Sequence, residues 1–192
     1  MALPQRQIEK DGYSEDEYFD FESTSLGRWE YVGGVIRAMS GGSDDHNTIA
    51  VNVAATLRSV LLPKGSRVYG ADMKIHTGDG VNTFPDVAVV CGKRVYHQGR
   101  TDVITNPSLI VEVLSDSTEA YDRGEKFDHY RTIPALTDYL LVEQDKARIT
   151  HYSRSDDDWE MRIHVSPESV VELGALGVSL ALADVYAAID FG

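Results

Sequence analysis

Two short apolar runs constrain the fold of this chain more than any other feature of its sequence. One covers residues 86–91 (DVAVVC) and the other covers residues 109–114 (LIVEVL). A strand with one face in water alternates apolar and polar residues, whereas an unbroken apolar run of this length is typical of a central strand covered on both faces. We therefore expect two neighbouring central strands of one sheet at these positions.

Helical and extended patterns alternate along the rest of the chain. A capping box formed by Ser14 and Glu17 predicts a helix over 15–21, and the Gly33-Gly34 turn predicts a hairpin. Apolar residues at helical spacing predict a helix over 45–62 that Asp44 or Asp45 caps. The other expected elements are the hairpin strands 28–31 and 35–39, further strands 67–76, 139–142, 148–152 and 159–165, and helices 117–131 and 180–189. This order, without repeat or linker, predicts one α/β domain over residues 1–192, a mixed β-sheet flanked by helices.

The acidic balance of the chain gives no reason to expect a general affinity for polyanions. The sequence has 18 basic and 31 acidic residues, a net charge of −13. Proteins that hold nucleic acid through its phosphates usually have a basic patch, and this sequence shows none. Bound divalent ions can offset part of the repulsion locally.

Targeting signals and metal-binding spacings are also missing from the sequence. No apolar run approaches the roughly 20 residues that span a bilayer, and no apolar segment follows a basic start as in a secretory signal. The single cysteine, Cys91, allows neither an internal disulfide nor a CxxC zinc motif. No His-x-x-x-His spacing that would assign a transition-metal site occurs among His76, His97, His129, His151 and His164. We expect a cytoplasmic protein without a membrane partner.

Two carboxylates stand out because they enter the apolar runs. Glu112 lies inside the second run, where an ionised carboxylate is costly unless it is paired or bound to a metal; an ion pair or a strand end near Ser115 would also explain it. Asp86 follows Pro85 and begins the first run, a dipeptide that alone is usually structural. On neighbouring strands the two acids form a hard-oxygen site suited to Mg²⁺ or Mn²⁺. Such an ion can activate water and stabilise a phosphodiester under attack.

Four stretches of the sequence carry a family resemblance. They are RWEYVGGVIRAMSGGSDDH, FPDVAVV, LIVEVLSDST, and RGEKFDHYR followed by DYLLVEQ. In this order the chain resembles, over nearly its whole length, the Uma2 (DUF820-like) family of the PD-(D/E)xK restriction-endonuclease-like superfamily. The resemblance implies a restriction-endonuclease-like mixed sheet with an N-terminal helix and hairpin. It also implies a homodimer that hydrolyses DNA phosphodiesters with Mg²⁺ or Mn²⁺.

The family pattern also implies roles for individual residues. Asp86 and Glu112 match its metal ligands. Leu114 occupies the place of the usual lysine two residues after the second acid, and Lys126 on the following helix matches the lysine that takes over this role in the family. Asp116 stands where the family often has proline, which adds a carboxylate beside the expected site.

Two further residues match the family, and each has a structural alternative. Glu30 matches an early acid that completes the metal shell, but it could instead be a cross-strand partner beside Arg28 in an edge hairpin. His46 matches a histidine that touches substrate or water, or it is a locally hydrogen-bonded residue at a helix start. Lys126 could likewise pair with Asp122, four residues earlier, on a solvated helix face.

Two other functions fit the same sequence. One is a non-catalytic member of the family that serves as a dimeric scaffold or a nucleic-acid-associated module, which the acidic composition favours. The other is a metal-dependent hydrolase of a smaller substrate, for which a net negative charge is no handicap. One fold hosts many activities, so the fold alone does not separate these alternatives.

Overall fold

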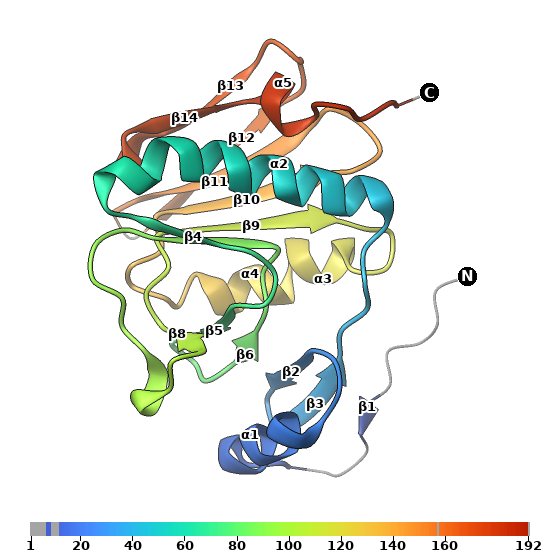
Figure 1. The fold of residues 1–192 in the computed structure, drawn as a ribbon, viewed down its shortest axis with the longest axis vertical. Coiled ribbons are helices and arrows are strands. Elements are labelled where there is room, and N and C mark those ends of the chain that lie inside the picture. Colours follow the sequence, from blue (N-terminus) through green and yellow to red (C-terminus); the bar gives the residue numbers. More distant parts are fainter. Residues whose placement is uncertain (1–6, 9–11, 157, 192) are drawn as a thin grey trace.

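The central sheet of the molecule contains both apolar runs. The computed structural model describes residues 7–8, 12–156 and 158–191, and its central sheet has the strand order β12-β11-β10-β9-β7-β4 (Figure 1). The second run forms β9 and the first forms β7, which pair antiparallel, and every residue of both strands is buried. The prediction of two neighbouring central strands is therefore confirmed. The strands are β4 (Arg67–Tyr69), β7 (Val87–Val90), β9 (Leu109–Leu114), β10 (Asp138–Glu143), β11 (Ile149–Ser155) and β12 (Asp158–His164).

Helices cover the two faces of this sheet. On one face lies α2 (Asp44–Leu61), whose buried positions Ile49, Val53 and Leu57 share a core cluster with β7 and β9. On the other face lie α3 (Glu119–Arg123) and α4 (Glu125–Tyr130) (Figure 1). None of the described helices has the length and apolar content needed to cross a membrane.

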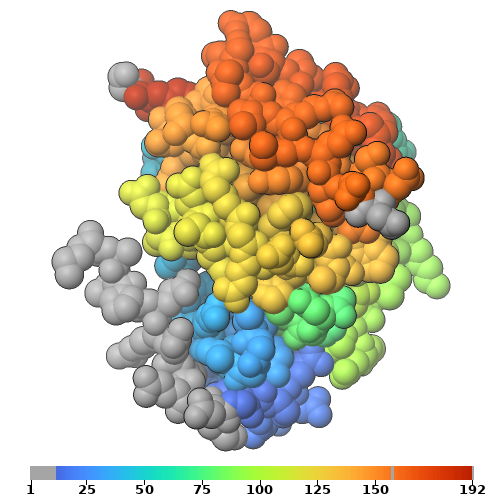
Figure 2. Space-filling view, turned by 180° about the vertical axis from the view of Figure 1, so that it is seen from behind, coloured from blue at the N-terminus to red at the C-terminus, as the bar shows by residue number. Residues whose placement is uncertain are grey.

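A second sheet, of order β1-β3-β2-β6-β5-β8, carries the N-terminal part of the chain. The expected helix is α1 (Glu15–Thr24), and its capping box is present; the expected hairpin turns at Gly33 and Gly34, whose φ angles are 57° and 85°. From behind, this N-terminal part (blue) lies below α3 and α4 (yellow) and the later strands (orange) (Figure 2). The strands are β1 (Gln7–Ile8), β2 (Trp29–Val32), β3 (Val35–Ala38), β5 (Lys74–His76), β6 (Asn82–Thr83) and β8 (Val103–Ile104).

Two expected elements are each divided in the structure. The strand predicted over 67–76 is β4 in the central sheet and β5 in the second sheet, joined by a turn in which the Met73 amide donates to the Gly70 carbonyl. The helix predicted over 117–131 is α3 followed by α4, because Gly124 between them adopts φ −115° and ψ −100°.

Smaller differences occur at one helix cap and in the C-terminal tail. The cap of α2 is Ser43, whose hydroxyl accepts the His46 amide, and neither Asp44 nor Asp45 takes this role. The tail predicted as a helix over 180–189 contains the end of β14 (Val178–Ala181), which pairs with β13 (Val170–Leu173), and then the short helix α5 (Leu182–Val185).

A close backbone contact holds the turn after β5 against the end of α4. The Gly78 amide donates to the Thr132 hydroxyl (2.9 Å), and a Cβ at Gly78 would lie 2.6 Å from the Thr132 carbonyl oxygen. We expect Gly78→Ala to cost about 1–3 kcal/mol, because the backbone must move apart. The matched control is Gly70→Ala, where nothing lies within 4 Å of the added Cβ. Equal melting temperatures of the two variants would contradict this contact.

Candidate active site between the two sheets

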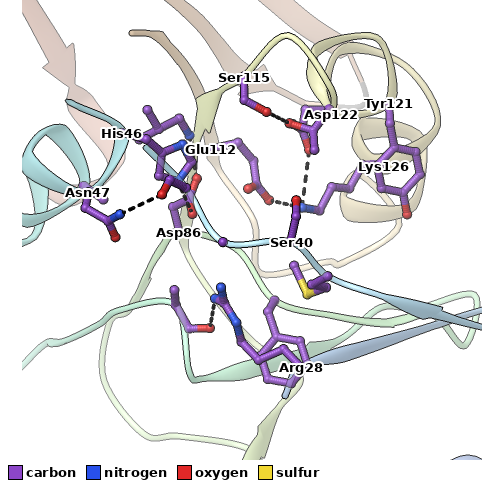
Figure 3. A pocket seen from close by; sticks show the side chains of 18 of the residues that line it. Arg28, Ser40, His46, Asn47, Asp86, Glu112, Ser115, Tyr121, Asp122 and Lys126 are labelled. Atoms are coloured by element: carbon purple, nitrogen blue, oxygen red, sulfur yellow. Dashed lines mark hydrogen bonds and ion pairs between the residues drawn. The ribbon is translucent and has the colours of Figure 1, made fainter. Parts of the chain in front are cut away.

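The pairing of β7 with β9 brings the two predicted metal ligands together. Val87 is opposite Val111 in this ladder, so one step earlier Asp86 is opposite Glu112, and directly opposed residues share a face of the sheet. The Val113 amide donates to Asp86 Oδ2 at 2.8 Å. Both carboxylates line one cavity of about 100 Å³ (Figure 3).

Lys126 extends from α4 into the same cavity. Its Nζ lies 2.9 Å from Glu112 Oε1, 3.3 Å from Asp122 Oδ1 and 3.8 Å from Glu30 Oε1. The residue is only 4% exposed. The alternative of a lysine on a solvated helix face is therefore wrong, although its predicted pairing with Asp122 is present (Figure 3).

Glu30 approaches this cavity from the second sheet. Strand β2 lies between β3 and β6, so it is not an edge strand, and Glu30 is buried. Its carboxylate accepts a hydrogen bond from the Thr83 hydroxyl on β6. The Arg28 guanidinium donates instead to the Ala71 carbonyl. Glu30 thus lines the cavity, and its cross-strand partner in the hairpin is Arg37 and not Arg28.

His46 orients the Asp86 carboxylate. Its ring projects from the first turn of α2, and Nε2 lies 3.0 Å from Asp86 Oδ1. A Cβ at Gly42 would lie 2.4 Å from the His46 ring, so a glycine at this position leaves room for the ring. Burial alone raises the pKa of Asp86, but its hydrogen bond to His46, the charge of that ring and the Val113 amide outweigh this and hold the pKa below its usual value.

The pKa values of Glu112 and Lys126 are both raised in this cavity. Burial raises the pKa of Glu112 well above its usual value; Lys126 opposes the rise, and the charges of Asp122 and Asp86 add to it. Burial lowers the pKa of Lys126, but Glu112, Asp122 and Glu30 outweigh it, so this pKa lies well above its usual value. The rise for Glu112 comes first from burial, whereas the rise for Lys126 comes from the carboxylates around it.

The sequence analysis did not assign two residues, Asp122 and Tyr130, to the site. Asp122 in α3 is buried, and its Oδ1 accepts no hydrogen bond although Lys126 Nζ is near it. The Tyr130 hydroxyl in α4 donates to Glu112 Oε1 at 2.8 Å. Both lie four residues from Lys126, and this helical spacing was the available signal, but it did not show which face is buried.

The lining of the cavity offers the hard oxygen ligands that a divalent ion would need. Four carboxylates, those of Glu30, Asp86, Glu112 and Asp122, line it. Among the described residues, Asp86 and Glu112 do not belong to any group of three His, Cys, Asp or Glu ligands that lie within 4.8 Å of one another. Two protein carboxylates suit Mg²⁺, which is usually bound by one or two carboxylates and keeps several waters.

Sequence comparison identifies relatives along most of the chain. The model of the Uma2 family, described as "Putative restriction endonuclease", matches residues 15–183. An uncharacterized protein of Synechocystis sp., slr1290, is 38% identical over 180 residues and the match covers 93% of each chain. A second protein of that organism, sll1609, is 33% identical over 142 residues, which cover 73% of this chain and 80% of the relative.

Structure comparison agrees with the sequence relatives. A crystal structure described as "a putative nuclease belonging to DUF820 from Anabaena variabilis ATCC 29413" superposes with a TM-score of 0.73. The match covers 90% of this chain and 96% of the other at 18% identity, which shows a shared fold and confirms the predicted restriction-endonuclease-like α/β architecture. Since the family model spans most of the chain and slr1290 matches it over nearly the whole length, this chain belongs to the Uma2 family.

Proposed function

We propose that this protein is a metal-dependent endonuclease that hydrolyses DNA phosphodiester bonds. The observation that carries the proposal is the opposition of Asp86 and Glu112 on paired central strands, with Lys126 Nζ 2.9 Å from Glu112. Family membership supports the same activity. Asp86 and Glu112 would hold Mg²⁺ or Mn²⁺, which when bound supplies water activation and neutralises charge at the phosphate.

The side chains of the chain itself would do three things in this reaction. His46 holds Asp86 in one orientation through its 3.0 Å contact. Lys126 places a fixed positive charge where the negative charge of the attacked phosphate grows, and preorganised charge of this kind is effective when its side chain is buried, as that of Lys126 is. Glu30, from the second sheet, completes the acidic wall of the cavity and helps to keep Lys126 charged.

A hydrolase of a smaller phosphate or ester substrate is the second candidate. The net charge of −13 favours it, because the whole protein repels a long polyanion. A catalytically inactive scaffold or nucleic-acid-associated module of the same fold is the third, and the same charge favours it. These candidates differ in which substrates the purified protein cleaves.

Cleavage assays separate the candidates. Plasmid, single-stranded DNA and nucleotides are incubated with the protein in Mg²⁺ or Mn²⁺, with chelator, and in parallel with Asp86→Asn purified in the same way to control for contaminating nucleases. We expect ion-dependent cleavage of DNA that the chelator and the variant both abolish. Cleavage of nucleotides alone would favour the smaller-substrate hydrolase, and ion-independent or absent cleavage would contradict an enzyme of this class.

We also expect a homodimer and a cytoplasmic location. The homodimer is supported by the edge strand β12, whose exposed face carries Met161 and Ile163, followed by exposed Val165. An alternating apolar edge of this kind is a natural surface for pairing with another chain. The cytoplasmic location stays a prediction from the sequence.

A further inference from the structure

A second cluster of ligand atoms lies on the N-terminal sheet. Glu15 begins α1, His76 ends β5, and His97 begins the short 3-10 helix His97–Gly99. His76 Nδ1 lies 3.1 Å from Glu15 Oε1, and His97 Nε2 lies 3.1 Å from Glu15 Oε2. Among the described residues, this is the one group of three His, Cys, Asp or Glu side chains whose ligand atoms all lie within 4.8 Å of one another.

The donor atoms of this cluster differ in kind from those around Glu112. Two imidazole nitrogens and one carboxylate oxygen suit Zn²⁺ and related transition metals, whereas an all-oxygen set suits Mg²⁺. Tetrahedral zinc with bonds of about 2.0–2.1 Å holds its ligand atoms roughly 3.3 Å apart. Since all pairs of ligand atoms lie within 4.8 Å, the three side chains need to close in by at most roughly 1.5 Å. All three are partly exposed, with 12–23% of each side chain accessible, so an ion can reach them.

The surroundings of the cluster hold its ligands in place. The rings of His76 and His97 stack with centroids 3.7 Å apart, which fixes both imidazoles side by side. The Asn82 amide donates to Glu15 Oε1 at 2.7 Å, and its Oδ1 lies 3.2 Å from His76 Nδ1. The bond from Asn82 to the Glu15 carboxylate is of the kind that orients ligands in metal sites, whereas the Asn82 Oδ1 contact is one that a bound ion would displace from His76 Nδ1.

We propose that Glu15, His76 and His97 form a binding site for Zn²⁺ or a similar transition-metal ion, separate from the Asp86 and Glu112 site. The three residues come from segments far apart in the sequence, which is why His-x-x-x-His spacing did not reveal them. A bound ion would join the start of α1, the end of β5 and the segment before β8 in one cross-link. We therefore expect the bound ion to stabilise the second sheet, which also carries Glu30.

Zinc binding to the full chain tests this site. The protein is freed of metal by chelator, returned to millimolar Mg²⁺ to occupy the oxygen site, and titrated with micromolar Zn²⁺ by calorimetry and thermal unfolding. We expect one equivalent of Zn²⁺ to bind. At a hundredfold excess over Kd, the melting temperature should rise by roughly 5–10 °C, since only the folded chain presents all three ligands.

The variants preserve the hydrogen bonds while removing the ligands. In His97→Gln and His76→Asn, an amide nitrogen replaces the imidazole nitrogen that faces Glu15, so both variants should fold with nearly unchanged melting temperatures in chelator. Each should lose the zinc equivalent and the thermal shift. Asp86→Asn and His164→Ala, which alters a partly buried histidine on the other sheet, should keep both. No zinc binding by the wild type, or wild-type binding by His97→Gln, would show that the cluster is only a hydrogen-bonded network.

Discussion

Asp86→Asn is expected to lower DNA cleavage by at least about a hundredfold and to remove the thermal stabilisation that Mg²⁺ or Mn²⁺ gives the wild type. The substitution deletes one of the two charges proposed to hold the ion, and with it the electrostatic stabilisation of the attacked phosphate. The fold should survive. An asparagine Oδ1 can still accept the Val113 amide, and its Nδ2 can donate to His46.

The measurements for Asp86→Asn are cleavage of a duplex and melting curves with and without millimolar ion. A ligand that binds only the folded state stabilises it by mass action, so the wild type should melt at a higher temperature in the ion. The control is Asp145→Asn, the same chemical change at an exposed carboxylate, which should behave as the wild type. If Asp86→Asn and the wild type respond equally to the ion, Asp86 is not a ligand.

Lys126→Met is expected to reduce cleavage by roughly a hundredfold or more while leaving the ion-dependent thermal shift in place. The ammonium stabilises charge and does not ligate the ion, so its loss affects the reaction and not the binding of metal. Lys126→Arg should restore little of the activity, because a planar guanidinium does not reproduce a compact charge in a tight cavity. Single-turnover cleavage by the purified variants measures both effects.

The same variant should show a pH-dependent loss of stability. Without Lys126, the buried acids Glu112 and Asp122 lose the ammonium that contacts both of them, a loss that costs about 3–5 kcal/mol near neutral pH. Burial already raises the pKa of Glu112, so the folded state of the variant binds protons more readily than the unfolded state. The cost should therefore shrink as the pH falls toward the usual carboxyl pKa of about 4.3.

Urea unfolding of Lys126→Met across this pH range gives the free energies. Lys93→Met, at an exposed lysine, serves as the control and should leave the free energy of unfolding unchanged at every pH. Wild-type cleavage rates and stability in Lys126→Met would remove Lys126 from the site.

The central strands and their two acids could be predicted because the signals were local. The run 109–114 is bounded by a Pro-Ser pair and by Ser115, and β9 has these same ends. A carboxylate inside such a run needs a partner wherever the rest of the chain lies. The capping box of α1 and the glycine turn of the first hairpin are also complete within a few residues.

The features that were missed depend on contacts between distant segments. Alternation over 67–76 continues through Gly70 and so cannot show that the chain passes there from one sheet to the other. Helical spacing correctly pairs Asp122 with Lys126, but which side of the helix is covered depends on the second sheet and on the break at Gly124. The grouping of Glu15 with His76 and His97 has no spacing signal at all.

Because the candidate site lies between two sheets, it cannot easily be transferred from one protein to another. Its side chains come from β2, α2, the start of β7, β9, α3 and α4, so the site extends along the chain from Glu30 to Lys126. No short segment contains it, and no exchange of a single segment with another protein would transfer it. Recombination within this span would have to preserve the strand pairing of both sheets and the way they pack around the site. The site is thus a property of the two sheets together and not of any one segment.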